Sequence, residues 1–397
     1  MILTVTLNTA LDITYRTAAL TPHATNRVAE VSERAGGKGI NVARVLAALG
    51  HETVVTGFVG GRTGDALREL LTAEPPAARP ADAATAHAPS AHARLTDERL
   101  TDARLTDERL AYERRTDPSV SGAPATEPPT ADAPMTDTPA TGALVTDALI
   151  TDALVPIAGT TRRTIAVVDE TTGDTTQLNE PGPTVTPAEW AAFLTSYEGL
   201  AARADAVALC GSLPPGIHVG AYAELVRIAR AAGLPVLLDT SGEPLRRGIA
   251  ARPDLVKPNA DELAQLTGSR EPLRATRDAR RRGGRAVVAS LGAAGMLAVT
   301  PDGSWRAAPP TAVRGNPTGA GDSAVAGLLS GLVERLPWPE RLARAVALSA
   351  ATVLAPAAGE FDREAYADLL PRVAVTEAVT ELSSQPEQGS HATRQHR

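Results

Sequence analysis

The chain has 397 residues, of which 43% are hydrophobic and 3% aromatic, and its net charge is −7 at pH 7. The negative charge, without a basic stripe interleaved with aromatic residues, excludes nucleic acid as the main partner, and a single cysteine, Cys210, excludes an intramolecular disulfide framework. No signal peptide is evident, and no apolar run approaches the roughly 18 residues of a membrane span. We therefore expect a cytoplasmic protein with no membrane partner.

The first helix is predicted directly after a glycine-rich turn. Residues 36–43 read Gly-Gly-Lys-Gly-Ile-Asn-Val-Ala, and the apolar residues that follow fall on one helical face. The lysine in this turn is informative because the chain has 39 basic residues, and only Lys38 and Lys257 are lysines. A compact, strongly hydrated ammonium group is not interchangeable with a guanidinium group. Both lysines lie in motifs, so we interpret them as functional rather than as chance surface positions.

Residues 75–152 differ in composition from the rest of the chain. They are rich in Ala, Pro, Thr and Asp, and Arg-Leu-Thr-Asp units begin at Arg94, Arg99 and Arg104. This spacing matches neither the helical nor the strand period, so neither element could bury all of the leucines on one side. We predict a low-complexity, mostly disordered insertion over 75–152 and a disordered tail over 384–397. The remainder, 1–74 and 153–383, is predicted to form one domain.

Strands and helices alternate along the second half of the chain. Strands are expected at 205–210, 235–239, 254–257 and 285–291, and helices at 219–232, 243–250 and 261–283, the last broken near Gly268. This alternation predicts crossover connections and a mainly parallel sheet with helices on both faces. Ligands bind such sheets beyond the carboxyl ends of the strands, where this chain has Gly211, Ser212, Asp239, Asn259, Ser290 and Gly292.

A second glycine-rich run, Asn-Pro-Thr-Gly-Ala-Gly-Asp-Ser at 316–323, leads directly into a helical pattern over 324–334. Glycines at a helix start let successive backbone N–H groups point into open space, and the positive end of the helix adds to the attraction for an anion. An anion site beside a carboxylate, here Asp322, is what phosphoryl transfer to a hydroxyl requires. A turn capped by Thr318 or Asp322 is the ordinary alternative.

Six motifs in this order resemble those of the ribokinase-like PfkB carbohydrate kinases, in particular the branch of 1-phosphofructokinase, tagatose-6-phosphate kinase and the minor 6-phosphofructokinase. They begin at Thr6, Gly36, Gly211, Leu238, Val256 and Thr318. No Walker-type or protein-kinase signature is present. The resemblance implies an α/β fold, a three-layer sandwich around a mainly parallel sheet, with a small β-sheet lid.

The lid would come from segments near 10–35 and 160–180. The second segment contains a polar β pattern at 163–168 that returns through 175–178. An exposed β element carries unpaired edges, which proteins usually cover. In the family that this chain resembles, the lid forms a dimer interface, so we expect a homodimer.

The resemblance also implies an enzyme that uses ATP. Asp322 would be the general base that takes the proton from the sugar hydroxyl. The N–H groups of Gly319, Ala320 and Gly321 would stabilise charge on the transferred phosphoryl group.

Asn259 and Glu262 match an N-x-x-E motif that holds Mg²⁺ and the nucleotide phosphates, largely through water. A first-turn glutamate favoured by the helix dipole is the alternative for Glu262. The further nucleotide-binding residues would be Lys257, Ser290, Gly292 and Gly295.

The substrate site implied by the resemblance comprises Asp12, Arg27, Gly37, Lys38, Asn41, Arg162 and Ser212. In it, Asp12 and Asn41 would bind sugar hydroxyls. The three cations, Arg27, Lys38 and Arg162, would bind a phosphate already present on the sugar. Arg163 lies beside Arg162 and leaves the register open by one residue. The run Thr-Arg-Arg-Thr at 161–164 departs from the Thr-Arg-x-Asn usual in sugar-phosphate kinases, which weakens the choice of one sugar phosphate over another.

The expected function is ATP-dependent phosphorylation of D-fructose 1-phosphate to fructose 1,6-bisphosphate. Tagatose 6-phosphate or fructose 6-phosphate as acceptor is the nearest alternative. A kinase of an unphosphorylated sugar or nucleoside would have no use for three converging cations. A non-catalytic sugar-binding regulator would have no use for Asp322 beside an intact anion site.

Overall fold

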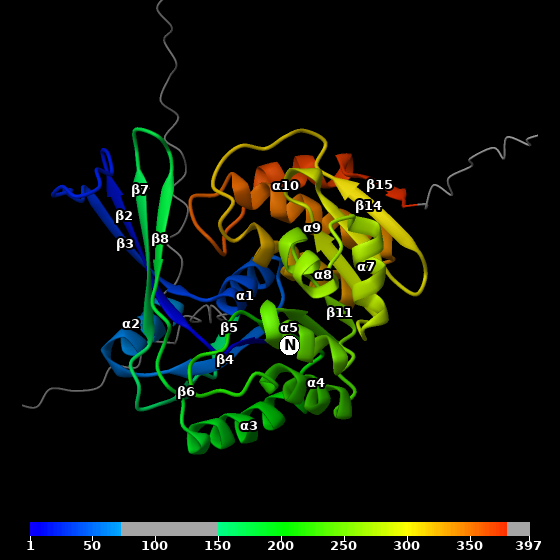
Figure 1. The fold of residues 1–397 in the computed structure, drawn as a ribbon, viewed down its shortest axis with the longest axis horizontal. Helices are drawn as coiled ribbons and strands as arrows, with labels where there is room; N and C mark the ends of the chain where they lie inside the picture. The colour runs from blue at the N-terminus through cyan, green and yellow to red at the C-terminus, as the bar shows by residue number, and fades with distance from the viewer. Residues whose placement is uncertain (73–148, 379–397) are drawn as a thin grey trace, which may run out of the picture. The chain divides into compact units, whose positions relative to one another are not determined.

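A sheet of eleven strands runs through the part of the chain that the computed structural model describes, residues 1–72 and 149–378 (Figure 1). Its order is β15-β14-β13-β12-β11-β10-β9-β1-β4-β5, with β6 paired to β4. Neighbours from β5 to β12 are parallel, and β13 to β15 continue the sheet in antiparallel fashion. The strands are β1 (Ile2–Thr6), β4 (Thr53–Val59), β5 (Ile150–Asp152), β6 (Val155–Pro156), β9 (Ala206–Cys210), β10 (Val236–Asp239), β11 (Leu255–Val256), β12 (Ala286–Ser290), β13 (Met296–Val299), β14 (Ser304–Ala308) and β15 (Ala374–Glu377).

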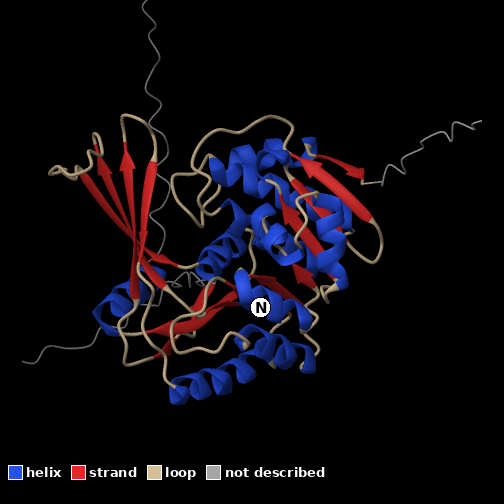
Figure 2. Ribbon diagram, viewed as in Figure 1, coloured by secondary structure: helices blue, strands red, loops and turns tan. Residues whose placement is uncertain are grey.

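Helices cover both faces of this sheet (Figure 2). One layer contains α3 (Pro187–Ala201), α4 (Ala221–Ala231), α5 (Gly242–Ala250), α6 (Ala260–Thr267) and α7 (Pro272–Arg281). The other contains α1 (Lys38–Ala48), α8 (Ala320–Val333), α9 (Trp338–Val353) and α10 (Arg363–Leu369), while α2 (Gly61–Thr72) packs in a smaller cluster with β4. Two short 3₁₀ turns lie at Gly292–Ala294 and Leu370–Arg372.

The central strands are buried on both faces because their side chains alternate between the two helical layers. In β9, Val207 and Leu209 pack with the α3–α7 layer, whereas Ala206, Ala208 and Cys210 pack with the layer of α1, α8 and α9. All five residues of β9 are buried, as expected for a strand covered on both sides. Cys210 is a buried free thiol of this strand.

A second sheet of four strands stands apart from the central one (Figure 1). It consists of β3 (Glu30–Gly36), β2 (Ala10–Thr17), β7 (Arg162–Asp169) and β8 (Thr175–Asn179), in that order. The two inner strands, β2 and β7, are parallel and come from distant parts of the sequence, with Ala10 opposite Arg162. We call this sheet the lid.

The predicted fold class, a mainly parallel sheet between helical layers with a small separate sheet, is confirmed. The predicted long helix is indeed broken: α6 ends at Thr267 with Gly268 as its C-cap, at a left-handed φ of 80°, and α7 begins at Pro272. A glycine pays no Cβ penalty in that conformation. The predicted strands and the lid hairpin are each found within a residue or two of their expected limits.

One limit of the predicted insertion is wrong. Residues 150–152 form β5, which pairs in parallel with β4 at the edge of the central sheet, so these residues belong to the folded domain. Residues 75–148 of the predicted insertion and all of the predicted tail lie outside the described residues. Within 1–72 and 149–378, no helix is long and apolar enough to span a bilayer.

Candidate active site

The carboxyl ends of neighbouring parallel strands bring the predicted residues together. Gly211 follows β9, Asp239 ends β10 and Lys257 follows β11. The backbone joins them, because Gly211 N–H donates to the Asp239 carbonyl at 2.9 Å and Lys257 N–H donates to that of Leu238 at 3.1 Å. This edge of the sheet is the ligand-binding edge expected for such folds.

Asp322 lies in the first turn of α8 and is buried, with 7% of its surface exposed. Its Oδ2 accepts a hydrogen bond of 2.9 Å from Asn41 Nδ2, on the first turn of α1. Burial raises the pKa of Asp322 to about 6, against the opposing effects of Lys38 and the Asn41 hydrogen bond. Two predicted site residues, 281 positions apart, are thus in direct contact.

Both lysines of the chain converge on one carboxylate, that of Asp239. Lys38 Nζ donates to Oδ2 at 3.0 Å, and Lys257 Nζ lies 3.3 Å from Oδ1 in an ion pair whose geometry falls outside that of a hydrogen bond. Asp239 is 1% exposed and Lys257 4%. Although burial opposes it, the two ammonium groups hold the pKa of Asp239 below its ordinary value, and Asp239 in turn raises the pKa of Lys38. The sequence had marked Asp239 as a strand-end residue without assigning it a role.

The start of α8 has the geometry of an anion site. Gly319 is its N-cap with a left-handed φ of 85°, and a Cβ there would lie 2.8 Å from the Cα of Ala358, so glycine is required on both counts. Among the described residues, the N–H groups of Gly319 and Gly321 have no hydrogen-bond acceptor. The N–H of Ala320 donates to the Pro317 carbonyl at 3.2 Å. Two of the three predicted amides are therefore free to meet an anion.

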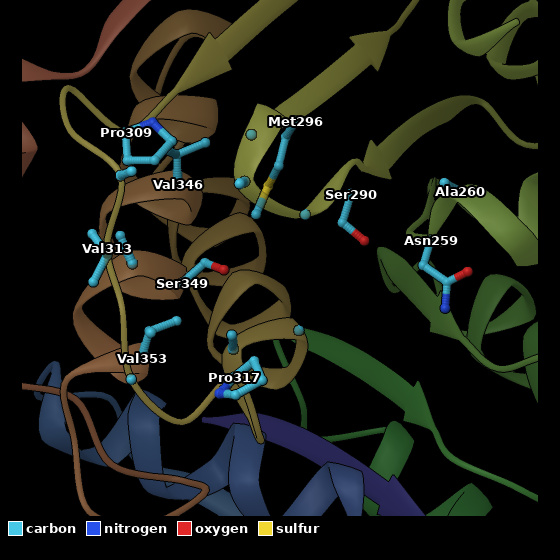
Figure 3. Close-up of a pocket in the computed structure, with 18 of the residues that line it drawn as sticks. Asn259, Ala260, Ser290, Met296, Pro309, Val313, Pro317, Val346, Ser349 and Val353 are labelled. Atoms are coloured by element: carbon cyan, nitrogen blue, oxygen red, sulfur yellow. The ribbon is translucent and has the colours of Figure 1, made fainter. Parts of the chain in front are cut away.

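A cavity of about 660 Å³ opens from this helix start toward β12 and α9 (Figure 3). Its volume is that of a small-molecule site. Of the predicted nucleotide-binding residues, those that line it are Asn259, Ser290, Gly292 and Gly295, whereas Lys257 and Glu262 do not. Ala320 and Gly321 also line it, so the cavity reaches the start of α8.

The opposite wall of the cavity is apolar and was not predicted from the sequence. Figure 3 shows Met296, Pro309 and Val313 together with Val346 and Val353 of α9 around the opening. Apolar residues at helical spacing are the ordinary signal for a core-facing helix. Nothing in the pattern of α9 therefore distinguished a cavity wall from buried core.

Asn259 and Glu262 make a reciprocal capping box at the start of α6. Asn259 Oδ1 accepts from Glu262 N–H at 2.8 Å, and Glu262 Oε2 accepts from Asn259 N–H at 2.9 Å. Such a box satisfies two amides that the helix cannot. Both residues therefore have a structural role, and the remaining carboxylate oxygen, Glu262 Oε1, is the atom left for a cation.

The lid carries the predicted sugar-binding aspartate. Burial raises the pKa of Asp12 on β2 to about 6, opposed chiefly by Arg162. Arg162 faces this side, with Nε 3.4 Å from the Asn8 carbonyl. Arg163 points the other way and forms an ion pair of 2.6 Å with Glu180, because successive residues of a strand face opposite sides. Of the two neighbouring arginines, Arg162 is therefore the one on the side of Asp12.

The other predicted substrate residues divide into two groups. Gly37 has a φ of 117° at the N-cap of α1, where a Cβ would lie 2.6 Å from Thr6 Cγ2. Ser212 Oγ accepts from Asn8 Nδ2 at 3.2 Å near the same strand ends. Arg27, in contrast, is exposed between β2 and β3 and makes no hydrogen bond or ion pair with the described residues.

Two arginines that the sequence did not single out also surround Asp12. Arg44 of α1 donates to the Ala35 carbonyl at 2.6 Å, and burial lowers its pKa to about 10. Arg34 of β3 forms a 2.6 Å ion pair with Glu360. Both act to lower the pKa of Asp12. Their signal was hidden because arginine is so common in this chain.

A doubly covered α/β sheet with a glycine-led helix start, a buried carboxylate beside it and an adjoining cavity has the parts that phosphoryl transfer to a small molecule requires. The comparison with known families agrees. The chain belongs to the pfkB family of carbohydrate kinases, whose profile matches residues 5–75 and 144–364. It is therefore an enzyme that transfers a phosphoryl group to an alcohol.

Known proteins similar to this chain carry related names. It is 34% identical over 363 residues to the 1-phosphofructokinase of Rhodobacter capsulatus, covering 89% of this chain and 92% of that protein. Phosphofructokinase-2 of Escherichia coli in complex with potassium has a similar fold, with a TM-score of 0.70 at 23% identity, covering 94% of this chain and 98% of that one. A protein described as "possible 1-phosphofructokinase" from Thermotoga maritima has a TM-score of 0.70 at 24% identity, covering 96% of this chain and 100% of that one.

The capping box generates a test with a matched pair of variants. Glu262→Gln keeps an acceptor at the third helical position, so we expect the free energy of unfolding to change little. Glu262→Ala removes the acceptor and should cost about 1 kcal/mol, as for loss of a cap. Urea unfolding measures both. Equal stability of the two variants would contradict a structural role for this carboxylate.

Proposed function

We propose that this enzyme is an ATP-dependent hexose-phosphate kinase that converts D-fructose 1-phosphate to fructose 1,6-bisphosphate. The observation that carries the chemistry is buried Asp322 one residue after Gly321, at the helix start that adjoins the cavity. The acceptor is supported by 34% identity with a 1-phosphofructokinase. Fructose 6-phosphate and tagatose 6-phosphate are the second candidates, the former because a structural neighbour, phosphofructokinase-2 of Escherichia coli, was crystallised with it.

Asp322 is the general base in this proposal. With a pKa of about 6 its carboxylate is charged at pH 7 yet more basic than an exposed aspartate. Asn41 holds Oδ2, which leaves Oδ1 to take the proton of the sugar hydroxyl. As that O–H bond breaks, the oxygen attacks the γ-phosphorus, the bond from the γ-phosphorus to the β,γ-bridging oxygen breaks, and ADP leaves.

The free N–H groups of Gly319 and Gly321 stabilise the charge on the transferred phosphoryl group. They lie at the positive end of α8, where backbone dipoles favour an anion. Lys257 brings a positive charge to the same place. Its Nζ lies 3.6 Å from the position that a Cβ at Gly321 would occupy. The adjoining cavity, with its apolar wall on α9, is the proposed place of the nucleotide base.

Carbohydrate kinases of this family use ATP with a divalent metal. Mg²⁺ keeps several waters and takes one or two carboxylates, which suits a site that offers one free carboxylate oxygen. Glu262 Oε1 and Asn259 would hold it, and the ion would neutralise phosphate charge. Glu262→Gln, which keeps the cap, should therefore raise the Mg²⁺ concentration needed for half-maximal activity.

The sugar phosphate is proposed to bind between the lid and the start of α1. Asp12 and Asn41 offer hydroxyl partners, and Lys38 and Arg162 offer positive charge for the phosphate already on the sugar. Arg162 is only partly buried, with burial lowering its pKa and Asp12 opposing that effect. An arriving phosphate would give this cation a second counterion.

The lid is proposed to pair with the lid of a second copy. Val31 and Leu178 on it are 56% and 57% exposed, and large exposed apolar patches mark protein–protein interaction sites. Phosphofructokinase-2 of Escherichia coli has a tetrameric inhibited form. For this chain a homodimer is the simplest symmetric assembly.

The assignment of Asp322 as the general base predicts a specific loss of activity. Asp322→Asn should lower kcat by about 10²–10⁴-fold without loss of folding, because it removes a buried charge. In the wild type, kcat/KM should fall as pH decreases through about 6, where the carboxylate becomes protonated. Asp12 has a similar pKa, so Asp12→Asn is the control and should keep this pH dependence. An active Asp322→Asn enzyme would refute the base.

A substrate panel tests the acceptor. We expect kcat/KM to be highest for fructose 1-phosphate among fructose 1-phosphate, fructose 6-phosphate, tagatose 6-phosphate and free fructose, each with ATP and Mg²⁺. Arg162→Met should raise KM for the sugar phosphate by roughly 10–100-fold, the worth of a hydrogen bond to a charged group. Arg163→Met, on the opposite face, is the matched control. Equal turnover of free fructose would overturn phosphate recognition.

Sedimentation tests the assembly. The wild type should sediment as a dimer at micromolar concentration, and Val31→Asp should shift it to monomer because it places a charge in an apolar interface. Leu354→Asp is the control, since Leu354 is 47% exposed outside the lid. A monomeric wild type would rule the homodimer out.

A further inference from the structure

Asp239 is a buried carboxylate to which the proposed reaction gives no step. It ends β10 and is 1% exposed. The flanking strand ends fix its backbone, since its carbonyl accepts from Gly211 N–H and the adjacent Leu238 carbonyl accepts from Lys257 N–H. A fully buried charge at a fixed place needs compensation.

That compensation comes from elements on two sides of Asp239. Lys38, at the start of α1, binds Oδ2 at 3.0 Å, and Lys257, after β11, lies 3.3 Å from Oδ1. Each carboxylate oxygen thus takes one ammonium group. The chain has two lysines, and both therefore have Asp239 as their counterion.

Both ammonium groups lie close to the reacting groups. Lys257 Nζ would touch a side chain at Gly321, and Lys38 and Lys257 both act on the charge of Asp322. Two aspartates and two lysines give this cluster no net charge. When Asp322 takes the proton of the hydroxyl, the cluster gains one positive charge at the moment when the phosphoryl group needs stabilisation.

We infer that Asp239 is a positioning residue for phosphoryl transfer, which holds both lysines beside the start of α8 and prevents them from pairing with Asp322. The inference rests on the function proposed above. If the lysines instead paired with Asp322, they would make it a weaker base, because an opposite charge nearby favours the ionised carboxylate. Asp239 thus keeps the cations near the phosphoryl site and the base reactive.

The groups facing Asp322 are few enough to make a pH test specific. They are Lys38 and Asn41 of α1, Asp239 of β10, and Lys257 after β11. Cys210 and Tyr222, which lie near Asp239, are neutral at pH 7 because burial raises the pKa of each well above its ordinary value. A change at Asp239 therefore reaches Asp322 through its own charge and the two lysines.

The test compares Asp239→Asn with the wild type in kcat/KM as a function of pH and in KM for ATP and for the sugar phosphate. We expect the acidic decline to move from near pH 6 to lower pH, by about one to three pH units. Both KM values should rise by about ten-fold or more, since each lysine loses its partner. A folded Asp239→Asn enzyme with an unmoved decline overturns the inference.

Two further variants complete the experiment. Asp239→Glu keeps the charge but displaces both ammonium groups, so both KM values should rise while the decline stays near pH 6. Should Asp239→Asn fail to fold, unchanged KM values in Asp239→Glu would overturn the inference instead. Asp254→Asn is the control, because Asp254 lies at the opposite end of the strands, where it accepts from Val236 N–H at 3.0 Å. This variant should change neither the KM values nor the pH of the acidic decline. A wild type without a decline near pH 6 would instead refute the proposed base.

Discussion

Mutual compensation of buried charges at the carboxyl edge of the sheet is the constraint on which the site depends. An unpaired ion in a protein interior costs several kcal/mol, yet Asp239 and Asp322 are both almost fully buried here. Parallel strands solve this because their carboxyl ends meet along one edge, so that Lys257 arrives beside Asp239 from the next strand. Lys38 reaches the same carboxylate from the helix after β3.

Two glycine-led helix starts bring the remaining groups to that edge. Gly37 and Gly319 both adopt positive φ and pack against backbone or side chains that a Cβ would meet. The helices that they open, α1 and α8, pack side by side in the same layer (Figure 1). Asn41 and Asp322, each in a first turn, consequently meet. Local backbone freedom at two positions thus produces a contact between distant segments.

The strands, the break at Gly268 and the two helix starts could be predicted because alternation, glycine and helical periodicity are local signals. The role of Asp239 as the counterion of both lysines could not be predicted, because no local sequence signal indicates that residues 38 and 257 lie beside residue 239. The N-x-x-E run shows a second limit, because the same spacing suits a metal site and the capping box that Asn259 and Glu262 form. The sequence could not show which of Arg162 and Arg163 lies on the side of Asp12, because a one-residue shift along a strand moves a side chain to the opposite face.

The parallel pairing of β2 with β7 has a consequence for how the chain tolerates length. Ala10 pairs with Arg162, 152 positions later, and residues 73–148 supply half of that separation. Loop-closure entropy grows with the logarithm of length, so doubling the distance costs the pair only about 0.6 kcal/mol. Evolution could therefore have lengthened this connection at small thermodynamic expense. The kinetic effect is larger, because on the ribosome β2 can pair only with β3 and its other edge waits unpaired until β7 emerges, and such long-range pairing folds slowly.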